Sequence, residues 1–326
     1  MTAKGVKPED EEPQDSYPYM WSPDSDIPIS EFASKHKPSM IQDDGTKPWI
    51  WVQSGRTPTR KDENVAEAVE EATSLLEEVK TKVQKIQDDP DIPLRSNKKK
   101  GTKSKKETRE LEQAQASEKL KEISTRQGYV SGKMLVFCPN ERVDITWKNV
   151  AESLLEGPLS KTTAYLAKVA TCPINDTHNS QHIICIYVPD VYDQAAVTEV
   201  LRVLVRQHGI TPNGVKSNLY TSIGLDSKHP SGIQSTVWKN TALIPDAELK
   251  ALKGEYFDEI PTDAKVAPSS KAKEVAPTAA EGVSDDVKPA SKVKAKSGPK
   301  LKRKAAADDP FASDSESDEP KKKARK

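Results

Sequence analysis

The sequence has few of the features that mark membrane proteins, secreted proteins and disulfide-bonded domains. No apolar run approaches the roughly 18 residues that a membrane-spanning helix needs. The N-terminus begins with polar and acidic residues instead of the apolar core of a secretion signal. There are only three cysteines, an odd number that fits free thiols in a reducing compartment. We therefore expect no membrane segment or membrane partner, no secretion and no disulfide framework.

Motifs of the common catalytic and cofactor sites are also missing. The chain has no phosphate loop, no dinucleotide-binding glycine motif and no nucleophile elbow. Four residues of types that bind zinc lie close together in the sequence: Cys172, His178, His182 and Cys185. Their spacing matches no common zinc module, and His182 and Cys185 would point to opposite faces of one predicted strand. We predict no metal, no cofactor and no enzymatic activity.

The composition predicts one folded domain with long solvated segments on both sides. Hydrophobic residues make up 34% of the chain and charged residues 31%, against typical values of about 45–50% and about 25%. The chain therefore cannot bury its whole length. We predict an acidic, mostly disordered arm at 1–46, a folded α+β domain at 47–260 and a disordered tail at 261–326, which is rich in Ala, Lys, Pro, Ser and Asp.

Apolar residues at helical spacing predict a long helical hairpin within the domain, at about 62–127. In its first helix, 62–88, these positions recur at alternating steps of four and three, typical of a helix packed against another helix. They are Val65, Val69, Ala72, Leu76, Val79, Val83 and Ile86. The second helix is expected at about 106–124. The basic loop between them, 95–106, is either a solvated loop or a nucleic-acid contact, although no aromatic residue is interleaved with its lysines.

Residues 132–209 form the centre of the predicted domain, because apolar and β-branched residues are most regularly spaced there. The predicted strands of this stretch are 133–137, 164–170 and 183–188, and the predicted helices are 143–156 and 193–208. The run 183–188 is apolar on both faces, which places it in the centre of a sheet. Asp193 is expected to cap the start of the last helix and Gly209 its end.

Further strands are expected on both sides of this centre. The strand 47–52 would direct Trp49 and Trp51 to one face of the sheet, since alternate residues of a strand share a face. Two more strands are predicted at 219–225 and 236–243. A short helix is predicted at 245–252.

One order of motifs runs through the centre and the C-terminal part of the domain. The motifs are Gly132-Lys133-Met134-Leu135, Trp147, His182-Ile-Ile-Cys185-Ile-Tyr187-Val-Pro-Asp190, the helix 196–209 and Leu219-Tyr220-Thr221-Ser222-Ile223-Gly224. This order resembles a eukaryotic family of unknown function named after the basophilic leukaemia expressed protein. That family is similar in fold to translation initiation factor 4E, the messenger-RNA cap-binding protein. The resemblance covers about 129–244 and 49–52, and implies a curved antiparallel sheet with helices on its convex face and the hairpin partly as an insertion.

The resemblance also implies candidate ligand-binding residues. Tyr187 matches an aromatic residue that touches the methyl group of the guanine, Lys168 lies near the phosphate-binding cation, and Tyr129 can offer one face of a stack. The two tryptophans that sandwich the cap in the 4E factor have no counterpart at 53–59 or at 125–129. Since stacking on a base contributes about 1–3 kcal/mol per ring, their absence argues against ordinary cap binding.

These observations predict a non-enzymatic binding or adaptor protein with a 4E-like fold. The concave sheet face, or the helix that carries Trp147, is expected to contact an unknown protein partner or RNA, because the family's convex helix docks partner peptides beside a tryptophan. The alternative is a cap- or nucleotide-type ligand bound by Tyr129, Lys168 and Tyr187.

Two basic clusters in the tail predict recognition by an importin-type receptor and a nuclear location. Their cations are Lys300, Lys302, Arg303 and Lys304 in the first cluster and Lys321, Lys322, Lys323, Arg325 and Lys326 in the second. Between the clusters, acidic residues follow Ser313 and Ser315 at the third position, which favours phosphorylation by an acid-directed kinase. The alternative is a charged tail that only aids solubility.

Overall fold

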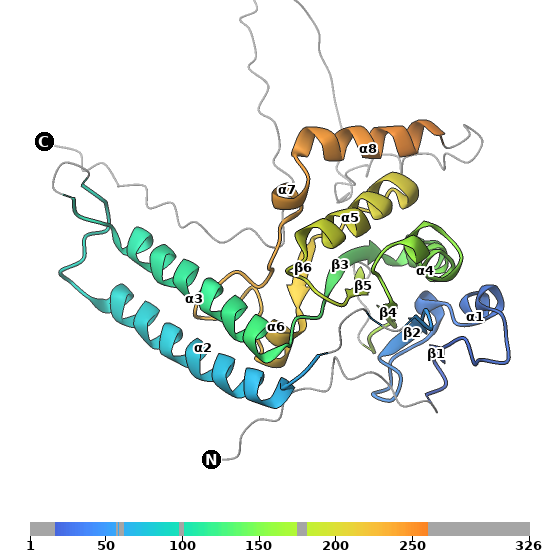
Figure 1. Cartoon of the computed structure of the whole chain (residues 1–326), viewed down its shortest axis with the longest axis horizontal. Coiled ribbons are helices and arrows are strands. Elements are labelled where there is room, and N and C mark those ends of the chain that lie inside the picture. Colours follow the sequence, from blue (N-terminus) through green and yellow to red (C-terminus); the bar gives the residue numbers. More distant parts are fainter. Residues whose placement is uncertain (1–16, 57, 59–61, 98–100, 175–180, 260–326) are drawn as a thin grey trace, which may run out of the picture. The chain divides into compact units, whose positions relative to one another are not determined.

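The computed structural model describes residues 17–56, 58, 62–97, 101–174 and 181–259. The predicted tail, with its import clusters and the serines Ser313 and Ser315, lies outside these residues. The strands are β1 Met20–Trp21, β2 Trp49–Gln53, β3 Gly132–Pro139, β4 Leu166–Ala170, β5 Gln181–Val188 and β6 Gly214–Ser217. The helices are α1 Ile29–Lys35, α2 Val65–Asp88, α3 Lys105–Gln127, α4 Asn140–Leu155, α5 Gln194–His208, α6 Asn218–Ser222, α7 Asn240–Leu243 and α8 Asp246–Glu259 (Figure 1).

The strands form one mixed sheet in the order β1-β2-β4-β5-β3-β6. All neighbouring pairs are antiparallel except β1 and β2, which pair in parallel over two residues. β5 lies between β4 and β3, so the prediction that 183–188 is a central strand is confirmed. The predicted α+β class is confirmed as well. Among the described residues, no helix is both long enough and apolar enough to span a membrane.

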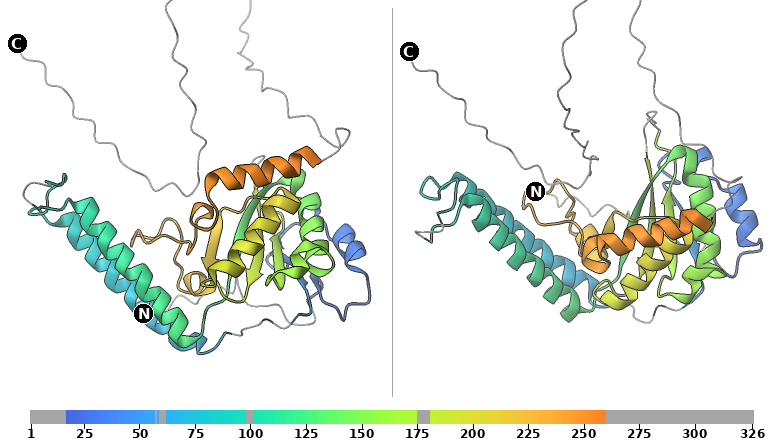
Figure 2. Two further views of the ribbon diagram at one scale, coloured as in Figure 1. Left: turned by 45° about the horizontal axis from the view of Figure 1, so that its top comes forward. Right: turned by 90° about the horizontal axis from the view of Figure 1, so that it is seen from above.

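The main apolar core lies between one face of this sheet and the helices α4 and α5. Alternate strand residues point into it, among them Ile50, Val52, Met134, Val136, Ile184 and Ile186. The helices contribute Val143, Trp147, Val150 and Leu154 from α4 and Val197, Val200, Leu201 and Leu204 from α5. α8 lies along the outer side of α5 (Figure 2). The predicted cap of α5 is also present, since the amide of Ala196 donates to the carboxylate of Asp193 at 3.0 Å.

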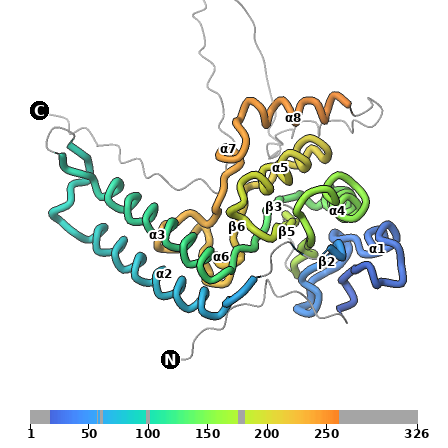
Figure 3. Tube along the Cα trace, in the orientation of Figure 1, coloured from blue at the N-terminus to red at the C-terminus, as the bar shows by residue number. Residues whose placement is uncertain are grey.

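The predicted hairpin is confirmed as the helices α2 and α3, which lie side by side (Figure 3). The second of them, α3, is followed by β3. Their contact buries a second apolar cluster, which includes Ala72, Leu76, Val79, Val83, Ala116, Leu120 and Ile123. At the start of α3, Ser104 and Glu107 form a capping box, in which each side chain bonds the other residue's backbone amide. Gly128, with φ of 74°, ends the helix. The base of the hairpin then passes straight into the sheet.

A hydrogen-bond network fixes the base of the hairpin to the sheet. The carboxylate of Asp62, just before α2, accepts hydrogen bonds from the amides of Val130 and Ser131, both at 3.0 Å. The hydroxyl of Ser131 also donates to Asp62 and accepts from the side-chain amide of Asn218 at 2.7 Å. The start of α2, the start of β3 and the start of α6 are therefore joined at one point.

Residues 17–46 are part of the fold, and the prediction of a mostly disordered arm is wrong for them. Trp21 on β1 and Ile29 and Phe32 on α1 belong to the main apolar core. The indole nitrogen of Trp21 donates to the carbonyl oxygen of Ile27 at 2.8 Å. Although this segment is acidic and rich in proline, it contains a few large apolar side chains. Their burial in the core holds the segment in a defined conformation.

The predicted strand at 219–225 is wrong, because this segment begins as the helix α6. The hydroxyl oxygen of Ser217 accepts a hydrogen bond from the amide of Leu219 at 3.1 Å and so caps the helix. Shortly after the helix, Gly224 adopts a positive φ of 70°, which a β-strand does not allow. A local side-chain cap thus outweighs the apolar pattern.

The predicted strand at 236–243 is also wrong. Only Trp238 pairs with the sheet, through an isolated bridge to Val215, and 240–243 is the helix α7. The last strand of the sheet is instead the four-residue β6, which includes Lys216. Its short polar sequence has no apolar alternation by which it could be recognised.

Arg56 fixes the loop that follows β2. Its guanidinium donates to the carbonyl oxygens of Ser160 and Thr162, at 2.5 and 2.8 Å, and to that of Ala164 at 2.5 Å. Thr162 and Ala164 are buried, so water cannot easily replace the guanidinium. Burial lowers the pKa of Arg56 below its usual value, but arginine stays charged in proteins. The fork of three bonds holds the loop against the segment 160–164.

Replacing Arg56 by alanine is expected to lower the free energy of unfolding by about 2–3 kcal/mol, because buried carbonyl groups lose charged hydrogen-bond donors. Arg56→Lys should lie between wild type and Arg56→Ala, since an ammonium cannot reproduce the fork. Urea unfolding monitored by circular dichroism measures both effects. Lys161→Ala, at an exposed position of the same segment, is the control. An Arg56→Ala midpoint equal to that of the control would contradict this role.

Candidate functional site

The face of the sheet opposite α4 and α5 carries the main candidate site. Strand register places Trp49, Trp51, Lys133, Lys168, Tyr187 and Lys216 on this side, together with Phe137, Gln53 and Gln181. We call the side formed by the first six residues the lysine–aromatic face. Among the strand positions on this side in the described residues, three are lysines and none is Asp or Glu. The side chains of the strands therefore make this face positively charged.

Lys168 lies at the centre of this face among three aromatic rings. Its Nζ atom is 4.0 Å from the ring centroid of Trp49, 4.7 Å from that of Trp51 and 5.8 Å from that of Tyr187. The rings of Trp51 and Tyr187 stack, with centroids 6.1 Å apart and planes 24° apart. Such contacts stabilise a cation by roughly 0.5–2 kcal/mol each. These contacts help to hold the Lys168 side chain in place. Lys168 is almost fully buried, with only 1% of its surface exposed.

Two further lysines extend the positive charge toward β6. The Nζ atom of Lys133 lies 5.4 Å from the ring centroid of Tyr187, and Lys133 is buried. Lys216 is its neighbour on β6 and is partly exposed. Trp49, at the other side of the face, is also partly exposed. In this conformation a ligand would therefore reach Trp49 and Lys216 first, with Lys168 beneath.

Of the three predicted ligand-binding residues, the structure brings Lys168 and Tyr187 together and places Tyr129 elsewhere. Tyr129 belongs to the apolar cluster under the helical hairpin. Its hydroxyl forms a hydrogen bond with that of Ser222, 2.9 Å away, and its carbonyl oxygen accepts a bond from the hydroxyl of Ser124. Tyr129 therefore supports the packing of α3 on α6 and does not line the lysine–aromatic face.

Trp147, the predicted partner-binding residue, lies in the core. It is 0% exposed and packs among Val143, Val150 and Leu154 of its own helix and the apolar face of the sheet. The stripe of α4 that carries Trp147 is the stripe that covers the sheet. The side chain cannot contact a partner in this structure, so its prediction as a contact residue is wrong.

Comparison with known proteins gives a family for the chain. The model of the family described as Basophilic leukemia-expressed protein Bles03 matches residues 2–222. The chain belongs to this family. No curated protein matches the chain. The resemblance seen in the sequence is thereby confirmed at the level of the Bles03 family, whose matched range includes all six strands and the helical hairpin.

Several residues of the lysine–aromatic face in this Bles03 member are not apparent as site residues from sequence. Trp49 and Trp51 are predictable as neighbours on one face, but their partner Lys168 lies on another strand. Lys133 and Lys216 occupy the same side only because β3 pairs with β5 and β6 in the observed register. The available signal is a single lysine within each of the apolar strands β3 and β4, which does not indicate a site.

The possible zinc residues do not form a metal site in the described part of this chain. His182 is buried, with Nδ1 2.7 Å from the carbonyl oxygen of Ala170 and Nε2 3.0 Å from the side-chain oxygen of Asn140. The Sγ atom of Cys172 is 3.9 Å from its Nε2. Cys185 packs on the other face of the sheet, and His178 lies outside the described residues. Within these limits, no group of three or more His, Cys, Asp or Glu is placed to hold a metal ion.

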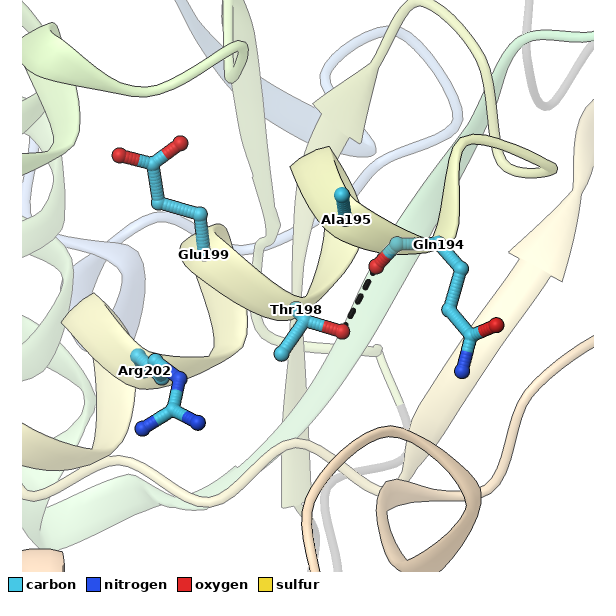
Figure 4. Close-up of a pocket in the computed structure, with 5 residues that line it drawn as sticks. All are labelled: Gln194, Ala195, Thr198, Glu199 and Arg202. Carbon is cyan, nitrogen blue, oxygen red and sulfur yellow. Dashed lines mark hydrogen bonds between the residues drawn. The ribbon is translucent and has the colours of Figure 1, made fainter.

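The outer side of α5 has a shallow depression without the chemistry of a ligand site (Figure 4). Thr198 uses its hydroxyl to donate to the carbonyl oxygen of Gln194 at 2.6 Å, within the same helix. Arg202 forms an ion pair with Glu248 of α8. These groups therefore serve the helix itself and its contact with α8.

Ser153 and His208 form a buried polar contact between α4 and the end of α5. The Oγ atom of Ser153 accepts a bond from the amide of Leu159 at 3.1 Å and lies 2.9 Å from Nε2 of His208. Burial lowers the pKa of His208 below its usual value. Ser153 is mostly buried, and the pair joins the two helices at the wall of a cavity of ≈ 690 Å³.

His208 should make this protein less stable in mild acid. Because its pKa is lower in the folded than in the unfolded state, the unfolded state binds more protons, and stability falls as the pH falls below about 6.5. In His208→Gln this loss of unfolding free energy between pH 7.5 and 5.0 should be smaller than in wild type. Urea titrations at each pH measure it, with exposed Lys161→Ala as the control. Equal pH dependence in wild type and His208→Gln would contradict this assignment.

Proposed function

We propose that this Bles03 member is a non-enzymatic binding protein, and that its lysine–aromatic face binds a single strand of RNA. The observation that supports this function is the position of Lys168 among the rings of Trp49, Trp51 and Tyr187. Single-stranded nucleic acids bind where positive charge follows the phosphates and aromatic rings stack on the bases. On this face Trp49 and Lys216 are a partly exposed ring and a partly exposed cation, whereas Lys133, Lys168, Trp51 and Tyr187 are buried.

Trp49 and Lys216 are the residues that we expect to meet the strand first, because both are partly exposed. Trp49 would stack on a base, while Lys216, with Lys133 behind it, would attract a phosphate. An acidic peptide would also favour the lysines, but it would need an aromatic side chain of its own to stack on the indole of Trp49. Every nucleotide of a single strand carries both a phosphate and a base that can stack, which favours a nucleic acid.

We further propose that the fold is of the initiation factor 4E type, with the sheet curved and the helices on its convex face. The antiparallel pairing of β2 through β6, with α4 and α5 on one face, supports this proposal. It does not extend to the usual cap clamp. The loop where the first clamping tryptophan would lie carries Arg56, which bonds the carbonyl groups of 160–164. Cap-specific recognition is the alternative, and a methylguanosine triphosphate analogue tests it.

A fluorescently labelled uridine oligonucleotide tests the proposed function by anisotropy titration of the full chain. Trp49→Ala should weaken binding about 5- to 150-fold, which corresponds to loss of about 1–3 kcal/mol of stacking. Lys216→Gln should weaken it and reduce its salt dependence, because one phosphate contact is lost. The control is Lys148→Gln, a partly exposed lysine of α4 that lies away from this face.

Three outcomes separate the possibilities. Saturable binding that Trp49→Ala weakens and Lys148→Gln does not supports RNA binding at this face. Binding of an acidic peptide but not of RNA would contradict it in favour of a protein partner. Tight binding of only the methylguanosine analogue would contradict it in favour of cap recognition.

We also propose a nuclear location, directed by the two basic clusters of the tail through an importin-type receptor. The support is the sequence alone: Lys300, Lys302, Arg303 and Lys304, and Lys321, Lys322, Lys323, Arg325 and Lys326. A fluorescent fusion without residues 300–326 should lose nuclear accumulation, as seen by microscopy. A fusion that lacks the equally long segment 262–288 should keep it. Unchanged distribution of the first fusion would refute the role of the clusters.

A further inference from the structure

A groove between α3 and the chain segment 232–238 forms a second possible site, separate from the lysine–aromatic face. It is a cavity of ≈ 520 Å³. One wall is a stripe of α3 side chains, Glu110, Gln113, Ala114, Ser117, Glu118 and Lys121. The other wall consists of Tyr192, Tyr220 and the chain segment from Gly232 to Trp238. The groove shares no residue with the lysine–aromatic face.

The α3 stripe at this groove is polar and largely exposed. The apolar residues of α3, Ala116, Leu120 and Ile123, pack in the cluster formed with α2. The stripe that faces the segment 232–238 has no large apolar residue to close the space between them, and Glu110, Ala114, Glu118 and Lys121 are exposed. The groove is therefore open to a ligand from solvent.

Each part of the groove is held by a specific contact. At one end, the side-chain amide of Gln113 donates to the carbonyl oxygen of Ser231 at 3.0 Å. Gly232 allows this approach, since a Cβ atom there would lie 2.4 Å from Nε2 of Gln113. The indole nitrogen of Trp238 donates to the carbonyl oxygen of Val191 at 2.7 Å, which fixes the ring at the groove wall. The walls are thus formed before any ligand binds.

The electrostatics of the groove favour a cation. Burial is the main cause that raises the pKa values of Tyr192 and Tyr220, and the negative charge of Glu118 adds the smallest contribution to each. Glu110 adds a second carboxylate at the rim. The cation already present, Lys121, lies 5.8 Å from the ring centroid of Tyr192. The ring of Tyr192 thus already interacts with an ammonium group of the chain itself.

We propose that this groove binds the lysine or arginine side chain of a basic peptide. The ligand's cation would lie between the carboxylate of Glu118 and the aromatic wall, in place of or beside the ammonium group of Lys121, while Glu110, about 12 Å along the helix, would attract a second basic residue of the peptide. Aromatic faces combined with carboxylates are the groups that recognise organic cations. The groove therefore selects ligands of the opposite charge to those of the lysine–aromatic face.

A fluorescently labelled peptide of alternating lysine and glycine, titrated against the full chain, tests the proposal. The double variant Glu110→Gln with Glu118→Gln should weaken binding about five- to tenfold. The matched control is Glu67→Gln with Glu70→Gln, which removes the same charge from exposed positions of α2 outside the groove. Equal weakening by both double variants would show general attraction to the hairpin and overturn the proposal.

A second pair of variants fills the groove without changing its charge. Ala114→Trp places an indole in the groove and should abolish saturable binding, whereas Gln115→Trp, one residue along the same helix and outside the groove, should not. Full binding by Ala114→Trp would overturn the proposal. Binding of the uridine oligonucleotide should be unchanged in Ala114→Trp, so failure of this site and failure of the RNA site are distinguishable.

Discussion

The alternation of side chains across a β-sheet is the constraint on which the rest of this structure depends. Because every second residue of a strand faces the same side, burying Ile184 and Ile186 under α4 and α5 turns Cys185 and Tyr187 to the other side. In β3 the same rule directs Lys133 away from the core that contains Met134. The positive, aromatic face is thus a direct consequence of covering one side of the sheet with helices.

A lysine as buried as Lys168 is costly unless its charge is stabilised, since removal from water disfavours an ammonium ion. The rings of Trp49, Trp51 and Tyr187 partly compensate by turning their faces toward Nζ. Lys168 also has a further interaction within the chain. An apolar residue at the same place would avoid this cost, and the proposal that the face binds a ligand gives one reason for a lysine there.

The sequence was sufficient to predict the elements with strong periodicity. The helices α2, α3, α4 and α5 and the central strand β5 combine regular apolar spacing with caps such as Asp193. The sequence was insufficient where a few hydrogen bonds or buried side chains determine the local structure and the spacing of apolar residues does not. Ser217 turns 218–222 into a helix by one side-chain hydrogen bond, and a handful of buried side chains order residues 17–46 despite their acidic composition. Pairing register, which depends on contacts between distant strands, is likewise not apparent in any local stretch.

The same limits explain which parts of the candidate sites could be predicted. Lys168 and Tyr187 were predicted through the family resemblance, and the structure brings them together. Trp147 was predicted as a partner-binding residue, although its own apolar stripe places it inside. Sequence patterns report which face of an element is apolar. They do not report which polar faces of separate elements come to lie against each other.

The groove beside α3 exists because the segment after residue 231 does not become a strand. If 236–243 had paired fully with β6, its backbone would follow the sheet edge and its side chains would alternate above and below it. Instead, a single bridge between Val215 and Trp238 anchors the segment, and the indole of Trp238 turns to the carbonyl oxygen of Val191. The aromatic wall then faces the polar stripe of α3, the second helix of the hairpin. The hairpin can thus contribute acidic residues to a second surface without altering the lysine–aromatic face, since the two share no residue.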